Sequence, residues 1–248
     1  MIELEGLTKT YDGARGVADL SFRVEAGGVL GLVGPNGAGK TTTLRCIAGI
    51  FPPAQGRIIL DGHDLIAEPL LAKRSLGFVP DEPRLFDYLT VREHLRFFGR
   101  LHGVSDAEAR GLALLEELEL AGKERFLPGT LSRGMRQKLA VACALLHEPR
   151  VLLLDEPLTG LDPVSMRRVT RMIRHRARAG AAIIVSSHLL HLVEELCSEV
   201  LVLAQGEMIA HGRVDDLREA LPSLRGRGDL EDIFLHVTGA SLPPESIR

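Results

Sequence analysis

Three short runs of consecutive apolar residues punctuate the chain, at residues 29–33, 151–154 and 181–186. Runs of this length without polar alternation are typical of strands that are covered on both faces, as in a parallel sheet. After the first run, apolar residues recur at helical spacing: Leu44, Ile47 and Ile50. The pattern therefore predicts an α/β core built on buried parallel strands.

Other segments alternate between apolar and polar residues, which is the pattern of half-buried antiparallel strands. Within residues 2–25, one face is apolar around Phe22. Residues 57–60 lead into an Asp-Gly turn at 61–62, and a Gln-Gly turn at 205–206 joins two further strands. We therefore expect an antiparallel β subdomain near the N-terminus and a hairpin near residue 205.

The stretch from about 84 to 147 has a helical pattern instead. Two capping boxes predict helix starts, at Thr90 with Glu93 and at Ser105 with Glu108. Apolar stripes follow them: Leu95, Phe98, Leu101, Leu112, Leu115 and Leu118. We interpret this stretch as a helical lobe inserted into the α/β core.

Two more helix starts carry polar caps. Ser132 precedes a helix whose apolar side includes Leu139, and its hydroxyl is suited to cap the first turn. Asp162 caps a helix that has Pro163 at its first position and Gly180 as its stop. By themselves these caps indicate ordinary helices that enter the core.

Composition narrows the class of protein. The chain has 248 residues, 45% of them hydrophobic and 25% charged, which is typical of a globular protein with one sizeable core. A net charge of −3 gives no basic footprint, so nucleic acid is not an expected partner. Cys46, Cys143 and Cys197 are far apart and odd in number, which favours reduced thiols in a cytosolic protein. No stretch resembles a signal peptide or a membrane span, so we expect any membrane role to depend on a partner.

A glycine-rich loop joins the strand at 29–33 to the helix that follows. Gly34, Gly39, Lys40 and Thr41 match the phosphate-loop pattern, in the strand, loop and helix context that it requires. Glycines let backbone N–H groups approach phosphate oxygens, Lys40 adds a positive charge, and the Thr41 hydroxyl is suited to Mg²⁺. The predicted nucleotide contacts of this loop are Gly34, Pro35, Asn36, Gly37, Ala38, Gly39, Lys40, Thr41 and Thr42.

With this loop, the predicted fold is a P-loop NTPase core with a mainly parallel sheet, an N-terminal antiparallel β subdomain and an inserted α-helical lobe. We assign residues 1–212 to one domain that contains the lobe at about 84–147, and 213–248 to a C-terminal extension. Within that extension, residues 230–237 read as a short amphipathic segment.

Polar residues follow the other two buried strands. Asp155 and Glu156 end one strand, and His188 follows the other. Carboxylates that leave a buried strand need a cation or a reacting group, which predicts Mg²⁺ for Asp155 and an attacking water for Glu156. Because the carboxyl ends of parallel strands share one edge of a sheet, we expect these residues to meet Lys40 there.

Tyr11 precedes the phosphate loop in a polar stretch, in a chain with two tyrosines and no tryptophan. We place it in a loop before the alternating strands. Two roles stay open for its ring, stacking on a nucleotide base or covering the edge of the sheet. A metal site at His188 and His191 is not expected, because no further ligand lies nearby in the sequence.

Five segments together resemble the ATP-binding cassette (ABC) transporter ATPases, over residues 1–212. GPNGAGKTT resembles the family's Walker A loop and VLLLDEP its Walker B strand. LSRGMRQKL is similar to the signature helix, LTGLDP to the D-loop and SSH to the switch histidine.

The resemblance implies a mechanism in a head-to-tail dimer, homo- or heteromeric, with ATP and Mg²⁺ bound between the subunits. Lys40 and Thr41 would hold phosphate and Mg²⁺, and Asp155 the metal. Tyr11 would stack on adenine, Glu156 would polarise the attacking water, and His188 would contact the γ-phosphate. Ser132 and Gly134 would contact the γ-phosphate bound by the opposite subunit, and Asp162 would communicate across the dimer.

Two departures from the family pattern stand out. Asp81, in FVPDEP, replaces the usual glutamine, and we expect its shorter side chain to reach Mg²⁺ through water. Arg133 and Met135 stand in the signature where glycine and glutamine are usual, whereas Gly134 is retained.

The signature and LEDIFLHVTG near the C-terminus resemble ATPases of exporters for drugs, lipids or polysaccharides. This resemblance implies an integral membrane permease as a separate chain, and a peripheral position at the inner face of the cell membrane. Two alternatives stay open. The arginines at residues 167–178 suggest a soluble ABC-type ATPase acting on nucleic acid or ribosomes, although such a charged helix face is usually solvated. Asp81 and Arg133 suggest a module that traps ATP without turnover.

Overall fold

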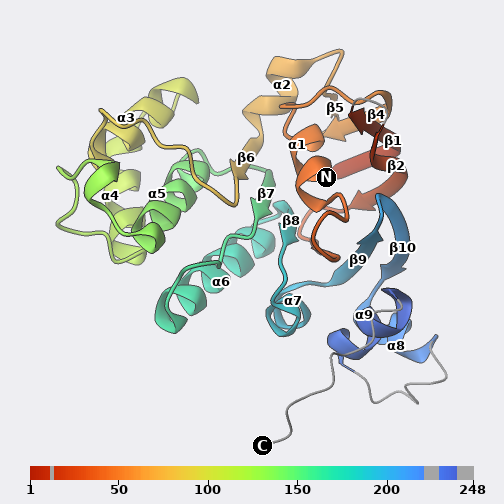
Figure 1. Cartoon of the computed structure of the whole chain (residues 1–248). Coiled ribbons are helices and arrows are strands. Elements are labelled where there is room, and N and C mark those ends of the chain that lie inside the picture. The colour runs from red at the N-terminus through yellow and green to blue at the C-terminus, as the bar shows by residue number, and fades with distance from the viewer. Residues whose placement is uncertain (12–13, 221–228, 239–248) are drawn as a thin grey trace, which may run out of the picture.

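The structure is a computed structural model that describes residues 1–11, 14–220 and 229–238 (Figure 1). Its centre is a six-stranded sheet in which β3, β8, β7 and β6 run parallel to one another and β9 runs parallel to β3. β10 pairs with β9 in the antiparallel sense. In spatial order the strands are β10 (Glu207–Gly212), β9 (Glu199–Ala204), β3 (Val29–Val33), β8 (Ala182–Ser186), β7 (Val151–Asp155) and β6 (Leu76–Val79). The predicted parallel core and the hairpin at 205–206 are confirmed.

A second, antiparallel sheet forms the N-terminal β subdomain. Its strands, in spatial order, are β2 (Ala14–Val24), β1 (Ile2–Tyr11), β4 (Gln55–Leu60) and β5 (His63–Asp64). Phe22 and its neighbours two residues away are buried on one face, as the alternation predicts. The loop assigned to Tyr11 is wrong, because Tyr11 is the last residue of β1 and pairs with Ala14.

Some helices lie on the two faces of the main sheet, and a further group lies beyond one edge of it (Figure 1). They are α1 (Lys40–Ile47), α2 (Pro69–Arg74), α3 (Val91–Leu101), α4 (Ala107–Glu117), α5 (Arg133–Leu145), α6 (Pro163–Arg178), α7 (Leu190–Leu196), α8 (Val214–Glu219) and α9 (Leu230–Thr238). A 3-10 turn at Pro128–Thr130 precedes α5. α1 is shorter than its apolar pattern predicts: Gly49 turns the chain with a φ of 64°, and Ile50 is 52% exposed.

α3, α4 and α5 form the predicted helical lobe. The capping box of Thr90 with Glu93 is confirmed, but the one at Ser105 is wrong. α4 starts one residue later, after Asp106, and the Glu108 carboxylate pairs with arginines of α3 instead of the backbone. The predicted stripes are also incomplete, because Leu101 and Leu112 are exposed.

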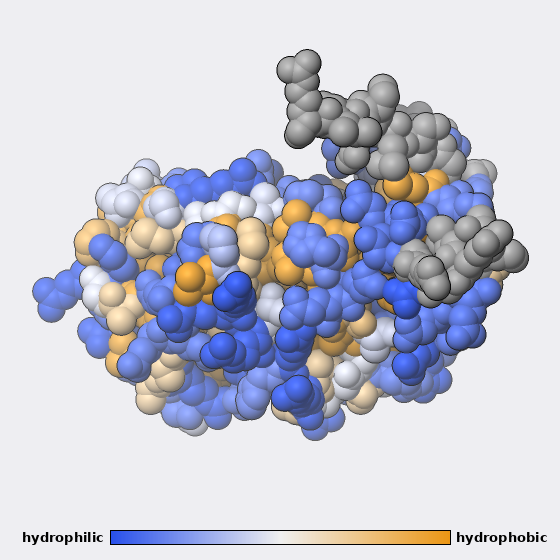
Figure 2. Space-filling model, turned by 90° about the horizontal axis from the view of Figure 1, so that it is seen from below, coloured by the Kyte–Doolittle hydropathy of each residue, from blue (hydrophilic) through white to orange (hydrophobic). Residues whose placement is uncertain are grey.

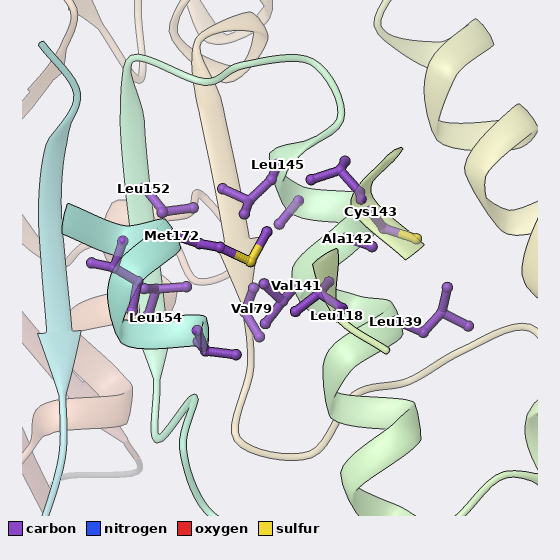
Figure 3. Close-up of a cluster of buried hydrophobic side chains, with 14 of the residues drawn as sticks. Val79, Leu118, Leu139, Val141, Ala142, Cys143, Leu145, Leu152, Leu154 and Met172 are labelled. Carbon is purple, nitrogen blue, oxygen red and sulfur yellow. The ribbon is translucent and has the colours of Figure 1, made fainter. Parts of the chain in front are cut away.

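The core continues from the sheet into the lobe. Figure 3 shows side chains of β6, β7, α5 and α6, and Leu118 at the end of α4, in one cluster that also includes Val79, Leu139, Leu154 and Met172, all less than 5% exposed. Burying side chains of this size stabilises the fold by about 1.5–3 kcal/mol each. The cluster therefore holds α5 and α6 against β6 and β7.

The basic face of α6 is only partly free. Of its six arginines, Arg168, Arg174 and Arg176 pair with glutamates of other elements. Figure 2, which views the molecule from below, shows hydrophilic residues over most of the described surface, with hydrophobic residues in separate patches. Among the residues that the structure describes, none of the helices has the length and apolar character that crossing a membrane requires.

At the C-terminal end, α9 packs on α7 and α8 beside β10. The predicted amphipathic segment at 230–237 is therefore a helix. Residues 221–228 and 239–248 of the predicted extension lie outside the described residues.

Candidate nucleotide-binding site

The loop between β3 and α1 needs its glycines. A Cβ on Gly34 would lie 2.4 Å from the Leu203 carbonyl oxygen, and a Cβ on Gly39 would lie 2.6 Å from Cγ1 of Val17. Gly39 also has a φ of 106°, which favours glycine over other residues. The loop is thus wedged between the two sheets in a shape that side chains at these positions would prevent.

The Lys40 side chain closes this loop. Its Nζ donates to the carbonyl oxygens of Gly34 at 2.5 Å and Pro35 at 3.1 Å. Lys40 is only 9% exposed, and burial lowers the pKa of its ammonium group from the usual value. A buried cation of this kind is stabilised by an anion bound close to it.

A cavity of about 630 Å³ opens beside the loop. It brings together most of the residues that the sequence predicts for the site: Tyr11, Asn36, Gly37, Ala38, Gly39, Lys40, Thr41, Thr42, Asp81, Asp155, Glu156 and His188. They come from the ends of β1, β3, β6, β7 and β8, from the loops that follow these strands, and from the first turn of α1. The convergence expected at the carboxyl ends of the parallel strands is therefore present.

Asp155 and Glu156 differ in their surroundings. Asp155 is 1% exposed, and Ser186 Oγ donates to its Oδ1 at 2.5 Å. Glu156 follows with a φ of 49°, a left-handed conformation that is uncommon outside glycine and typical of functional sites. The backbone N–H of Glu156 donates to the Ser186 carbonyl oxygen at 3.1 Å, and this bond ties the turn after β7 to the end of β8.

The Glu156 carboxylate is held at the cavity wall by its neighbours. His188 Nδ1 lies 2.8 Å from Glu156 Oε2, and an ionised carboxylate can only accept a hydrogen bond, so Nδ1–H is the donor of this pair. The Thr159 hydroxyl donates to the same oxygen at 3.4 Å. The other carboxylate oxygen remains available to a molecule in the cavity.

Tyr11 lies at the edge of the cavity and is 38% exposed. Its ring meets Phe51 edge-on, with ring centroids 5.8 Å apart, and Lys9 Nζ lies 5.4 Å from its centroid. The side chain therefore covers part of the sheet edge and also lines the cavity.

Five predicted site residues do not line the cavity of this chain. Gly34 and Pro35 shape the loop behind Lys40. Ser132 caps α5 by accepting from the Met135 N–H at 3.2 Å, and a Cβ on Gly134 would lie 2.9 Å from the Gly160 carbonyl oxygen.

Asp162 caps α6 by accepting the N–H groups of Val164 and Ser165. These bonds, with that of the Ser165 hydroxyl as the largest cause, lower the pKa of Asp162 to about 2.

Three cavity residues were missed at the sequence level as parts of this site: Gly16, Arg133 and Thr159. Gly16 lies close to Tyr11 in sequence, and Thr159 lies close to Glu156. This proximity is the only feature of the sequence that indicates a place for them in the site. Arg133 departs from the family pattern in the sequence, but its place in the cavity depends on how α5 packs against the loop after β7.

The fold and this cavity define a nucleotide-binding P-loop protein. A sequence model of the family described as ABC transporter matches residues 17–159. The chain is 39% identical over 226 residues to the ABC transporter ATP-binding protein NatA of Bacillus subtilis (strain 168), covering 89% of each chain. It is also 39% identical over 213 residues to the Nod factor export ATP-binding protein I of Paraburkholderia xenovorans (strain LB400), covering 85% of this chain and 70% of that protein.

A solved structure described as the ATP binding subunit of an ABC transporter superposes with a TM-score of 0.91 at 33% identity, covering 96% of this chain and 99% of that one. The chain belongs to the ABC transporter family and is an ATP-binding, ATP-hydrolysing domain of it.

Proposed function

We propose that this chain hydrolyses ATP with Glu156 as the general base and Lys40 and His188 as its partners at the terminal phosphate. The observation that carries this assignment is the position of the Glu156 carboxylate, 2.8 Å from His188 Nδ1 and in the same cavity as Lys40. A base must lie within hydrogen-bond reach of the water it activates, and the cavity gives water access to this carboxylate.

The neighbours of Glu156 set its direction. The donors from His188 and Thr159 both bind Oε2, which leaves Oε1 to accept a proton from the attacking water. Lys40 supplies positive charge at the phosphate end, where negative charge develops during transfer. In this assignment the loop N–H groups from Asn36 to Thr42 hold the remaining phosphates.

The donor atoms at the cavity fit Mg²⁺. The Thr41 hydroxyl and the Asp155 and Asp81 carboxylates are hard oxygen donors, and the free Oδ2 of Asp155 is available at the cavity. Within the described part of the chain, no group of three or more His, Cys, Asp and Glu residues is arranged to hold a metal alone. This suits an ion that takes its other ligands from phosphate and water, and that neutralises charge on the phosphates when bound.

The residues outside the cavity suggest a second subunit. Ser132 and Gly134 lie at the exposed start of α5, and Asp162 lies on the same side of the molecule at the start of α6. We assign Ser132 and Gly134 to the nucleotide of the opposite subunit in a head-to-tail dimer, and Asp162 to contacts across it. Tyr11 is assigned to the adenine ring.

We assign the chain to an exporter, in which an integral membrane permease is a separate subunit and this chain lies at the inner face of the membrane. The name of the Nod factor export relative supports export, and the high coverage of both chains supports a shared role. We do not include nucleic acid among the proposed partners, because half of the arginines on α6 are already paired with glutamates.

The test is the substitution Glu156→Gln, which keeps the shape of the side chain and removes the base. We expect ATP turnover to fall by about 10²- to 10⁴-fold while ATP binding persists. Glu116→Gln, at an exposed glutamate of α4, is the control and should leave turnover unchanged. Phosphate release by the Glu156→Gln variant at the unaltered rate would remove Glu156 from the mechanism, and an absence of phosphate release in the unaltered protein would favour an ATP-trapping module.

A further inference from the structure

Three neighbours hold the Tyr11 ring at the edge of the nucleotide cavity. Its edge-on contact with Phe51 joins ring centroids 5.8 Å apart, at an interplanar angle of 82°. The ammonium group of Lys9 lies 5.4 Å from the Tyr11 centroid and 5.9 Å from the Phe51 centroid, so one cation contacts both rings. Gly16 also lies against the ring, since a Cβ there would lie 2.8 Å from Cε2 of Tyr11. Although Tyr11 is 38% exposed, its ring is therefore confined.

Lys9 and Phe51 are themselves tied to the backbone after α1. Lys9 Nζ donates to the Pro52 carbonyl oxygen at 2.9 Å, which holds the ammonium group beside the two rings. The Phe51 N–H donates to the Arg45 carbonyl oxygen at 3.2 Å, and the Arg45 guanidinium lies 5.7 Å from the Phe51 centroid. The Phe51 ring also packs against the buried cluster that contains the apolar side of α1. The support of the Tyr11 ring is thus anchored to α1.

α1 connects this support to the phosphate loop. The helix begins with Lys40 and Thr41, which line the cavity, and Arg45 lies in its last turn. Its eight residues span about 12 Å. One helix therefore sets both the phosphate end of the cavity and, through Phe51, the place of the Tyr11 ring.

A ring that is already fixed favours ligands that carry a base. When a mobile aromatic side chain must be immobilised on binding, the lost freedom weakens the Kd by about 2- to 10-fold. A ring held in place avoids this loss when a flat base stacks on it. A bare polyphosphate contacts the loop alone and gains nothing from the ring. The support of Tyr11 therefore acts on the choice between these two kinds of ligand.

We propose that Phe51 is a positioning residue for the nucleotide base: it holds the Tyr11 ring where the base stacks, and so makes the site prefer a nucleoside triphosphate to bare triphosphate. Lys9 contributes to the same hold. Phe51 does not line the nucleotide cavity, so it acts through Tyr11. The proposal rests on the proposed assignment of Tyr11 to the adenine ring.

The test measures the Kd of the ATP analogue AMP-PNP and of inorganic tripolyphosphate for the full chain by titration calorimetry. For Phe51→Ala we expect the Kd of AMP-PNP to rise by about 3- to 10-fold and that of tripolyphosphate to stay within about twofold. Phe51→Tyr, which keeps the ring, should restore the Kd of AMP-PNP. Phe78→Ala is the matched control and should change neither Kd. Phe78 packs against the same buried cluster and, within the described part of the chain, has no ring contact with Tyr11.

Tyrosine fluorescence reports on the ring itself. The chain has two tyrosines and no tryptophan, so a Tyr88→Phe background leaves Tyr11 as the single emitter. Tyr88 is 92% exposed, and its replacement should leave binding unchanged. In this background Phe51→Ala should lower the fluorescence anisotropy of Tyr11 in the ligand-free protein. Lys9→Met, a milder change at the surface, should lower it as well, which keeps the test open if Phe51→Ala folds poorly.

The other outcomes separate this proposal from the one on which it rests. Equal losses for AMP-PNP and tripolyphosphate in Phe51→Ala, no loss, or an unchanged Tyr11 anisotropy would each show that Phe51 does not position the ring. Tyr11→Ala should weaken AMP-PNP binding at least as much as Phe51→Ala does. If Tyr11→Ala leaves AMP-PNP binding unaltered, the assignment of Tyr11 to adenine fails. If Tyr11→Ala weakens it and Phe51→Ala does not, only the positioning role fails.

Discussion

The hydroxyl of Ser186 holds the Asp155 carboxylate in place, and its removal should destabilise the fold. Ser186 is fully buried at the end of β8, and its Oγ donates to the equally buried Asp155 at 2.5 Å. The same oxygen accepts from the Glu156 N–H at 3.2 Å. The substitution Ser186→Ala removes both bonds and leaves a carboxylate oxygen without a donor.

The expected loss follows from these two contacts. A hydrogen bond to a charged group contributes about 1.5–3 kcal/mol, so we expect the free energy of unfolding to fall by about 2 kcal/mol. For a domain of this size, each kcal/mol lowers Tm by about 2–4 °C. Ser186→Ala should therefore lower Tm by about 4–8 °C.

Urea unfolding followed by circular dichroism at neutral pH measures the change. Ser187→Ala is the matched control, because Ser187 is also buried but its Oγ accepts only a backbone N–H, from Leu189. Its loss should be smaller, about 1 kcal/mol. A double-mutant cycle with Asp155→Asn isolates the Ser186–Asp155 pair and should give a coupling energy of about 1–2 kcal/mol. A coupling energy near zero, or a loss for Ser186→Ala no larger than the control, would refute the reasoning.

Two further outcomes follow from caps and buried groups. Asp162→Ala removes the cap of α6 and the bond from Ser165, and should lower Tm by about 2–4 °C at neutral pH. Because hydrogen bonds lower the pKa of Asp162 to about 2 in the folded protein, this difference in Tm should shrink as pH falls from 4 toward 2. A difference in Tm that persists at pH 2 would contradict this role of the carboxylate. His94 is fully buried and accepts from the Phe86 N–H at 3.0 Å, and burial lowers its pKa below the usual 6.5. As pH falls, the unfolded chain binds a proton at this histidine before the folded protein does, so the free energy of unfolding should fall below pH 6.5. In urea titrations at several pH values, His94→Leu should reduce the slope of this free energy against pH, whereas His191→Leu, at an exposed position, should not. Equal slopes in the unaltered protein and both variants would rule out this role of His94.

Periodicity and local chemistry were sufficient for much of the fold. The buried runs, the Thr90 cap and the Asp162 cap depend on residues close together in sequence, and the structure confirms them. The box at Ser105 failed because Glu108 found partners twelve and sixteen residues away, on another helix. Local pattern contains no information about such competing contacts.

The same limit applies to the site. The phosphate loop, the carboxylates and His188 could be expected to meet because parallel strands share one edge, which is a rule of topology. Ser186 and Arg133 could not be assigned in this way. Their contacts depend on the packing of β8 beside β7 and of α5 against Gly160.

The bonds from Lys40 to Gly34 and Pro35 have a consequence for the rate and cost of nucleotide capture. The ammonium group binds two carbonyl oxygens on the inside of its own loop, so contacts within the chain hold the loop in shape. A loop held in this way loses little chain entropy when a ligand binds to it. Under the proposed assignment of Lys40 to phosphate, binding exchanges these two carbonyl bonds for bonds to phosphate oxygens.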